Sequence, residues 1–307
     1  MKPVGKAKKD VPRLLEKYNI LRSPGMLNNL AELSYAERLI DICLFSLGLL
    51  KTDCARIDLI SLVVGKQYHA YRKAVVTAKG PEVLTSRPVN STLFITDETI
   101  LTPLLERFRT ADYEGLSPET ITALLYTIAM AFCAANDVRQ KDDKKTPGTF
   151  FEWFIAHIFA RQFSKLPAKK VRVPAGESGK CELKTDIIFD LGPGQVKFHV
   201  PVKLSTRERS IQAWAHQRIL AGLWGDTEFK GLLVVLGETK LAHESLKVTE
   251  ILVPQQWAVF QRYIARMDKV YFLDLPEKYF VLATGHPKID VKPLGAFFAE
   301  KDALLVR

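Results

Sequence analysis

Two residues with complementary chemistry stand on either side of a short turn. Asp186 begins the run DIIFD at residues 186–190, and Lys203 lies near the end of a second β-forming run at residues 195–204. The residues between them, LGPG, are typical of a tight turn, so the two runs are expected to pair as a hairpin. Such a hairpin can bring a carboxylate and an amine to one place. We therefore expect Asp186 and Lys203 to converge.

A carboxylate beside an amine is suited to the hydrolysis of a phosphodiester. The carboxylate can hold a divalent metal ion next to the phosphate, and the amine can assist the attacking water and the developing charge. Asp190 is the weaker carboxylate candidate because it falls at the turn. An Asp and a Lys across a hairpin also occur by chance, so the surrounding residues have to decide.

The hairpin resembles that of the PD-(D/E)XK nucleases, the superfamily that includes most type II restriction endonucleases. In that family the hairpin Asp binds Mg²⁺ and the Lys on the next strand orients or activates water. The resemblance implies these roles for Asp186 and Lys203. It also implies an α/β fold, in which a central mixed sheet is flanked by helices.

The residues after Lys203 narrow the resemblance. Arg207, Glu208 and Arg209 complete a K-x-x-x-R-E-R run, similar to the restriction endonucleases that read CC and GG in CCGG- or CCNGG-type sites. There the Arg-Glu-Arg side chains read bases from a helix start. The resemblance implies that Arg207, Glu208 and Arg209, together with Ser205, bind DNA. Arg can donate two hydrogen bonds to guanine, and Glu can accept one from cytosine. The alternative is a solvated, charged helix start.

The resemblance also points to Glu152. In this family a Glu on the helix before the hairpin often approaches the metal ion, and Glu152 precedes Asp186 by 34 residues. However, Thr149 and Glu152 also satisfy a capping box, in which the Glu would only accept a backbone hydrogen bond. We expect Glu152 to belong to the active site.

A second metal ligand is harder to assign. The position two before Lys203 is acidic in the usual family pattern and is Pro201 in this chain. In the CCGG-type branch the carboxylate comes instead from the following helix, about thirteen residues after the Lys. That position is His216, followed by Gln217, and Mg²⁺ prefers oxygen ligands, which favours Gln217. Glu152 is the alternative ligand.

Net charge supports a polyanionic partner. The formal net charge is +10, from 44 basic and 34 acidic residues, which fits double-stranded DNA but also a basic surface kept for solubility. One group of basic residues precedes the hairpin and either contacts phosphates or forms a solvated loop. It consists of Lys165, Lys169, Lys170, Arg172, Lys180 and Lys184.

Other features of the sequence indicate where in the cell the protein acts. No stretch reaches the roughly 18 apolar residues of a membrane span, and residues 1–9 are not followed by an apolar signal core. The four cysteines have no CxxC or zinc spacing, which favours buried thiols in a reducing cytoplasm. We expect a cytoplasmic protein with Mg²⁺ but without a membrane anchor or a small-molecule cofactor.

The chain is expected to divide at its charged segment, residues 136–145. Residues 1–145 would be mainly helical and supply dimer contacts and a DNA clamp, whereas residues 146–307 would form the nuclease core. A palindromic target calls for a homodimer. Residues 58–79 are predicted to be helical, and their Tyr68, Tyr71 and Arg72 are candidate DNA contacts. A helix that packs its tyrosines inward is the alternative.

Further elements are predicted from hydrophobic patterns and turn residues. The predicted helices cover residues 12–21, 34–49, 117–135, 149–163, 207–221 and 254–267. The predicted strands include a pair within residues 83–95 and the segments 232–236, 270–274 and 279–282.

Overall fold

The computed structural model describes residues 7–77, 80–175, 179–206 and 210–306. The chain forms two compact units, each assembled from segments that are distant in sequence. The first unit comprises Met1–Glu114, Ala123–Phe154 and Thr239–Glu250, and the second comprises Gly115–Thr122, Ile155–Glu238 and Ile251–Arg307. The units are interleaved along the chain instead of meeting at a single boundary near residue 145.

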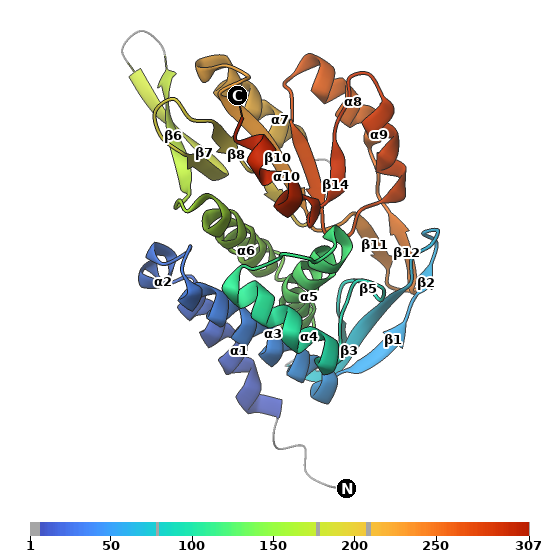
Figure 1. Ribbon diagram of the computed structural model, residues 1–307. Coiled ribbons are helices and arrows are strands. Elements are labelled where there is room, and N and C mark those ends of the chain that lie inside the picture. The colour runs from blue at the N-terminus through green and yellow to red at the C-terminus, as the bar shows by residue number, and fades with distance from the viewer. Residues whose placement is uncertain (1–6, 78–79, 176–178, 207–209, 307) are drawn as a thin grey trace, which may run out of the picture. The chain divides into compact units, whose positions relative to one another are not determined.

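A mixed sheet forms the centre of the second unit (Figure 1). Within the described residues it has seven strands in the order β14-β13-β10-β8-β7-β6, with β9 beside β10. The strands β8, β9, β10, β13 and β14 run parallel, β7 is antiparallel to β8, and β6 is antiparallel to β7. The bounds are β6 (Ala168–Ala175), β7 (Gly179–Asp190), β8 (Lys197–His199), β9 (Val202–Lys203), β10 (Phe229–Val235), β13 (Lys269–Phe272) and β14 (Val291–Pro293).

Both faces of this sheet are covered, as expected for apolar parallel strands. Leu233 and Val235 of β10 pack in a cluster with Trp214 and Trp257 from the helices on one face. On the other face Phe189 of β7 packs with aromatic residues of α6 and α10. The elements around the sheet are α6 (Lys145–Phe163), α7 (Ser210–Trp224), α8 (Pro254–Tyr263), η2 (Glu277–Phe280), α9 (Val281–Thr284) and α10 (Ala296–Leu304). The predicted mixed sheet flanked by helices is confirmed.

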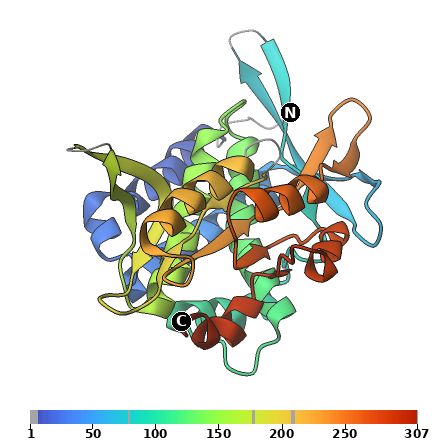
Figure 2. The ribbon, with the colours of Figure 1, turned by 90° about the horizontal axis from the view of Figure 1, so that it is seen from above.

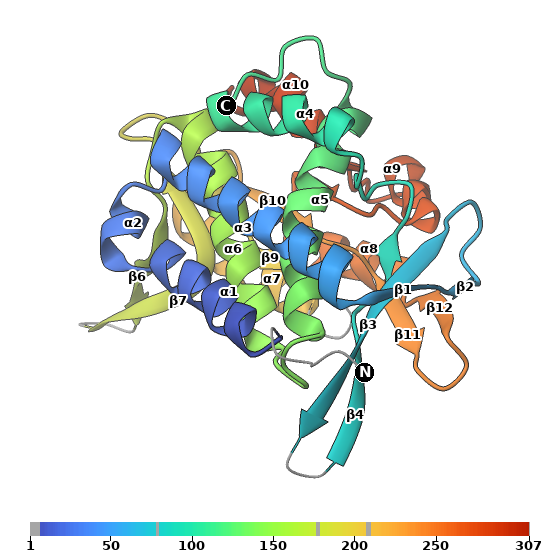
Figure 3. The ribbon, with the colours of Figure 1, turned by 90° about the horizontal axis from the view of Figure 1, so that it is seen from below.

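The first unit combines a helical bundle with two small sheets (Figure 3). Helices α1 and α3 lie side by side, and Phe132 stacks on Phe150 at 4.0 Å. The helices are α1 (Ala7–Leu21), α2 (Pro24–Asn28), α3 (Leu33–Asp53), α4 (Glu98–Thr110) and most of α5 (Pro118–Asp137). The strands are β1 (Ala55–Asp58), β2 (Ile60–Ser61), β3 (Tyr68–Thr77), β4 (Gly80–Thr85), β5 (Val89–Asn90), β11 (Thr239–Ala242) and β12 (Lys247–Glu250).

Two sequence-based predictions of elements were wrong. Within residues 58–77 the chain forms β2 and the whole of β3 instead of a helix, and the tyrosine, valine and threonine residues of β3 favour a strand. Residues 279–282 form turns of η2 and α9 instead of a strand. Helix α3 begins at Leu33, one residue before the predicted start, after Glu32 without a side-chain cap.

Helix α5 is apolar enough to raise the question of a membrane. Over 20 residues it passes the length and composition test for a membrane span, but 78% of the tested window is buried inside the protein. A helix that is apolar all round and buried in this way is typical of the core of a large protein.

Candidate active site

Asp186 and Lys203 meet on β7 and β9 of the second unit. Nζ of Lys203 lies 2.6 Å from Oδ2 of Asp186, and the same oxygen accepts a 3.0 Å hydrogen bond from the backbone N–H of Val202. Because two donors share one carboxylate oxygen, the position of Asp186 relative to β9 is fixed. The convergence expected from the hairpin is therefore present.

The backbone of β9 is held by β10. The N–H of Val234 donates to the carbonyl of Pro201 at 2.9 Å, and the N–H of Leu236 donates to the carbonyl of Lys203 at 3.0 Å. Pro201 has no N–H to donate, so a proline is tolerated where only the carbonyl joins the sheet. The replacement of the usual acidic residue by Pro201 thus leaves the strand that carries Lys203 intact.

The pair is accessible without being fully solvated. The side chain of Asp186 is 24% exposed and that of Lys203 is 18% exposed, while the neighbouring Ile187 and Val202 are buried. Partial removal from water strengthens the attraction between the two charges. The arrangement keeps a carboxylate and an amine together at a position that solvent reaches.

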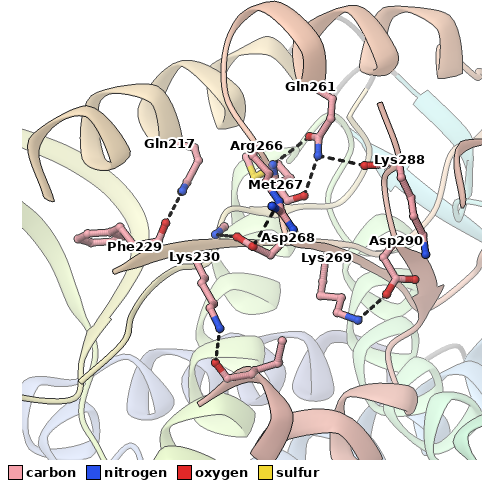
Figure 4. Close-up of polar contacts among 12 residues, drawn as sticks. Gln217, Phe229, Lys230, Gln261, Arg266, Met267, Asp268, Lys269, Lys288 and Asp290 are labelled. Carbon is pink, nitrogen blue, oxygen red and sulfur yellow. Dashed lines mark hydrogen bonds and ion pairs between the residues drawn. The ribbon is translucent and has the colours of Figure 1, made fainter. Parts of the chain in front are cut away.

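Gln217 has a structural place inside the second unit. Its Oε1 lies 3.1 Å from Nδ1 of His199, and its Nε2 donates to the carbonyl of Phe229 at 2.7 Å (Figure 4). Gly231 on β10 makes room for this side chain, because a Cβ there would lie 3.0 Å from the Gln217 amide. Both ends of the amide are thus used in the core, which argues against the prediction that Gln217 binds Mg²⁺.

The adjacent residue, His216, is electrostatically coupled to the pair. Burial is the main cause that lowers the pKa of His216, the positive charge of Lys203 acts in the same direction, and Asp186 opposes both. Its ring centroid lies 6.1 Å from that of His199. A neutral imidazole can bind a metal ion. Of the two predicted ligands on α7, His216 is the one that the structure leaves available.

His199 is a site residue that the sequence did not single out. The ring is completely buried, and burial is the main cause that lowers the pKa of His199 to about 4. Because the Gln217 amide nitrogen donates to a carbonyl, its oxygen is left to accept from Nδ1 of His199. Nε2 has no hydrogen-bond partner among the described residues. Only the fold reveals this contact, since 18 residues separate His199 from Gln217.

The donor atoms fit one mode of Mg²⁺ binding. The described part of the chain contains no group of three His, Cys, Asp or Glu side chains that could enclose a metal ion. Mg²⁺ is usually held by one or two carboxylates, and substrate phosphates and water complete its coordination. Asp186 offers one such carboxylate at a partly exposed position. The residues therefore suit an ion that is shared with a bound phosphate, not one enclosed by protein.

Glu152 lies on α6 in the first unit, whereas Asp186 and Lys203 belong to the second. Its side chain is half-buried. The capping-box alternative is excluded, because α6 already begins at Lys145 and Thr149 lies inside the helix. A role for Glu152 as a metal ligand remains a prediction.

The segment between β9 and α7 is anchored at its buried end. Ser205 is half-buried, and the backbone N–H of Thr206 donates to Oε1 of Glu238 at 2.9 Å. The hydroxyl of Thr206 donates to the same oxygen, and Glu238 is itself buried. The predicted base-reading residues Arg207, Glu208 and Arg209 lie outside the described residues.

The predicted aromatic DNA contacts are in the core of the first unit. Tyr68 and Tyr71 lie on β3 and are only 2% and 6% exposed. Tyr68 packs against Val248, and Tyr71 makes an edge contact with His69 at 5.2 Å. Neither ring offers a face to a flipped base, so this prediction was wrong. The tyrosines pack inward as the alternative held, but from a strand and not from a helix. Arg72 is half-buried on the same strand, and its role in DNA binding remains a prediction.

Comparison with known proteins identifies the fold of the chain. No protein-family model matches the chain, and no curated protein matches it. The chain is similar to the crystal structure of the Type IIP restriction endonuclease Kpn2I, with a TM-score of 0.74 and 22% identity over 96% of this chain and 99% of that chain. Similarity to the restriction endonuclease PspGI in its complex with substrate DNA is weak, with a TM-score of 0.38 and 14% identity over 69% and 81% of the two chains. The first comparison shows that this chain has the mixed α/β fold of a restriction endonuclease.

Proposed function

We propose that the chain is a type II restriction endonuclease that hydrolyses double-stranded DNA with the help of Mg²⁺. The proposal rests on the 2.6 Å contact between Lys203 and Asp186 at a partly exposed position. This contact joins the two groups that phosphodiester hydrolysis needs. The fold similarity to Kpn2I supports the proposal.

In the proposed reaction Asp186 holds Mg²⁺ at the scissile phosphate. When bound, Mg²⁺ polarises the phosphate and makes water a better nucleophile. Lys203 orients the attacking water and offsets charge on the phosphate oxygens, and its contact with Asp186 keeps the amine in place. The second protein ligand is His216, which is coupled to the pair, or Glu152, which would add a carboxylate.

Recognition in this proposal depends on Arg207, Glu208 and Arg209, with Ser205 beside them. They would read a palindromic site that contains CC and GG. A homodimer would match the symmetry of the site, and the N-terminal residues 1–145 would supply dimer contacts and an outer DNA clamp. The protein would act in the cytoplasm.

Digestion of a plasmid of known sequence with Mg²⁺, followed by mapping of the ends, tests the function. Lys203→Ala should bind DNA without cutting it. Lys197→Ala is a matched control, since Lys197 pairs with Asp190 at 3.1 Å on the same hairpin. This control should cut as the wild type does, and sedimentation of the wild type would test the dimer.

Each outcome distinguishes the proposal from a rival. Discrete fragments with ends at one sequence support a restriction endonuclease. Cleavage only at nicked, branched or mismatched DNA would indicate a structure-selective repair nuclease of the same fold. DNA binding without cleavage, unaffected by Lys203→Ala, would indicate a non-catalytic DNA-binding protein.

A further inference from the structure

The hairpin of β6 and β7 has one strongly basic face. The sequence alone left the basic residues before Asp186 as either phosphate contacts or a solvated loop, and the structure places all of them except Lys165 on β6 and β7. Lys170 lies opposite Lys184, Arg172 lies opposite Glu182, and Lys180 lies opposite Pro174. Side chains directly opposite in an antiparallel pair share a face. We call this set, four basic residues and Glu182, the basic face.

The charges on the basic face are not balanced within it. Glu182 forms an ion pair with Lys170 at 2.8 Å. The pKa of Glu182 is lowered first by this hydrogen bond and by the charge of Lys170, and also by Arg172 and Lys184. One carboxylate therefore stands among several cations. Like charges directly opposite in a sheet destabilise the pairing, and a second anion beside the ion pair of Lys170 with Glu182 would further offset the charge of Lys184.

The other face of the hairpin is apolar and holds the hairpin against the rest of the second unit. Val171 and Leu183 lie opposite each other and pack against the cluster of Ile188, Leu220 and Phe229. This apolar face fastens the hairpin to α7 and β10 of the second unit. The basic face is then presented on a supported element, which loses less entropy on binding than a free tail would.

The hairpin leads directly away from the candidate active site. Lys184 precedes Asp186 by two residues on β7, and Lys180 precedes Lys184 by four. At about 3.3 Å per residue, Lys180 is roughly 20 Å along the strand from Asp186. Figure 2 shows this hairpin, in olive, extending outward from the other strands of its sheet. Its length matches about six base pairs, over which duplex DNA carries about twelve phosphate charges.

We propose that the basic face binds the phosphate backbone of double-stranded DNA beside the cleavage site. Arg172, Lys180 and Lys184 contact phosphates, and Lys170 exchanges part of its bond to Glu182 for a further one. These contacts add affinity that does not depend on base sequence. The inference rests on the proposed function, because it places the DNA by reference to Asp186.

The test compares two pairs of exposed lysines. The variant K180Q/K184Q changes the basic face, and K240Q/K247Q changes β11 and β12, an antiparallel hairpin of the first unit. Each variant removes two positive charges. Binding of 30-base-pair duplexes, one cut by the wild type and one uncut, would be measured in EDTA by fluorescence anisotropy between 50 and 200 mM KCl.

With K180Q/K184Q, the slope of log K against log[KCl] should become shallower by about 1.8, since each lost phosphate contact contributes about 0.9. Across this salt range the loss of affinity should then be about twelvefold smaller than for the wild type. The same change should appear with both duplexes, and K240Q/K247Q should keep the wild-type slope. Circular dichroism melting would verify that both variants are folded.

The proposal is overturned if K180Q/K184Q keeps the wild-type slope, which would leave the basic face for another acidic partner. Equal changes in both variants would also overturn it, because they would reflect net charge alone. If either result is found and the wild type still cuts DNA at discrete sites, the proposed function stands and only the contact between the basic face and DNA is rejected. If the wild type neither binds nor cuts DNA, the proposed function itself fails.

Discussion

Nζ of Lys203 lies 2.6 Å from Oδ2 of Asp186, although 17 residues separate them in the sequence. The same hairpin carries a second pair, Lys197 and Asp190, at 3.1 Å. The two pairs differ in their surroundings, since the side chain of Asp186 is 24% exposed and that of Asp190 is 58% exposed. The chain thus contains its own control for an ordinary surface ion pair.

Replacement of Lys203 should separate binding from cleavage. Lys203→Ala should lower the rate of DNA cleavage by about 10²- to 10⁴-fold, because the attacking water loses the group that orients it. DNA affinity should change little, and Lys197→Ala should keep the wild-type rate. Single-turnover cleavage and anisotropy would measure the two effects. A similar loss of rate in both variants would contradict the assignment.

Asp186→Asn tests the carboxylate with little change in shape. The amide oxygen can still accept from the N–H of Val202, but the charge that attracts a divalent cation is lost. Cleavage should fall by at least about 10²-fold, and a higher Mg²⁺ concentration should be needed for any residual activity. Asp190→Asn should show the wild-type dependence on Mg²⁺. An active Asp186→Asn enzyme would rule out the proposed metal site.

Gln217 should matter for stability instead of metal binding. Gln217→Leu leaves Nδ1 of His199 and the carbonyl of Phe229 without their partner, and each buried unpaired group costs about 1–3 kcal/mol. The free energy of unfolding in urea, measured without metal, should fall by about 2–6 kcal/mol. Gln212→Leu, at an exposed position of the same helix, should change it by less than about 0.5 kcal/mol. A metal ligand would show the opposite pattern, with little effect in the absence of metal.

Acid should destabilise both units through buried histidines. Burial is the main cause that lowers the pKa of His69 and of His199 to about 4, whereas an unfolded histidine titrates near 6.5. Below pH 6.5 the unfolded chain therefore binds more protons than the folded chain. The stability that each histidine contributes is complete above that pH and is lost as the pH falls towards 4.

The expected loss between pH 7 and pH 5 is roughly 2 kcal/mol for each of the two residues. Urea unfolding at both pH values would measure it. His69→Gln should reduce the difference by about that amount, and His243→Gln, at an exposed position, should not. Equal pH dependence in His69→Gln and the wild type would contradict this account.

Local patterns predicted the part of the site that is built locally. Asp186, the turn and Lys203 belong to one hairpin, so their spacing alone was enough to predict that they meet. The segment 58–79 was wrongly predicted to be a helix, although residues 68–77 are rich in tyrosine, valine and threonine, which favour strands. Strand β6 was missed because its alternate residues include Lys170 and Arg172. A sequence rich in basic residues is also typical of a solvated loop, and only the opposite strand distinguishes the two.

Contacts between distant segments could not be derived from one sequence. β12 pairs with β2, and Lys66 forms an ion pair with Glu250 at 3.0 Å across 184 residues. This pairing puts residues 239–250 into the first unit, which no boundary based on composition would suggest. The hydrogen bond between His199 and Gln217 could not be predicted from the sequence either, because each residue alone is only a polar side chain on an apolar element.

Two consecutive residues of α7 have very different surroundings. Gln217 is tied to two strands, and nearly every replacement would leave a gap or an unpaired group. His216 is coupled to the reactive pair without belonging to that network. His216→Asp would therefore change the charge near the pair while the buried network of Gln217 stays intact. In this scaffold, a substitution at residue 216 should be separable from folding, whereas one at residue 217 should not.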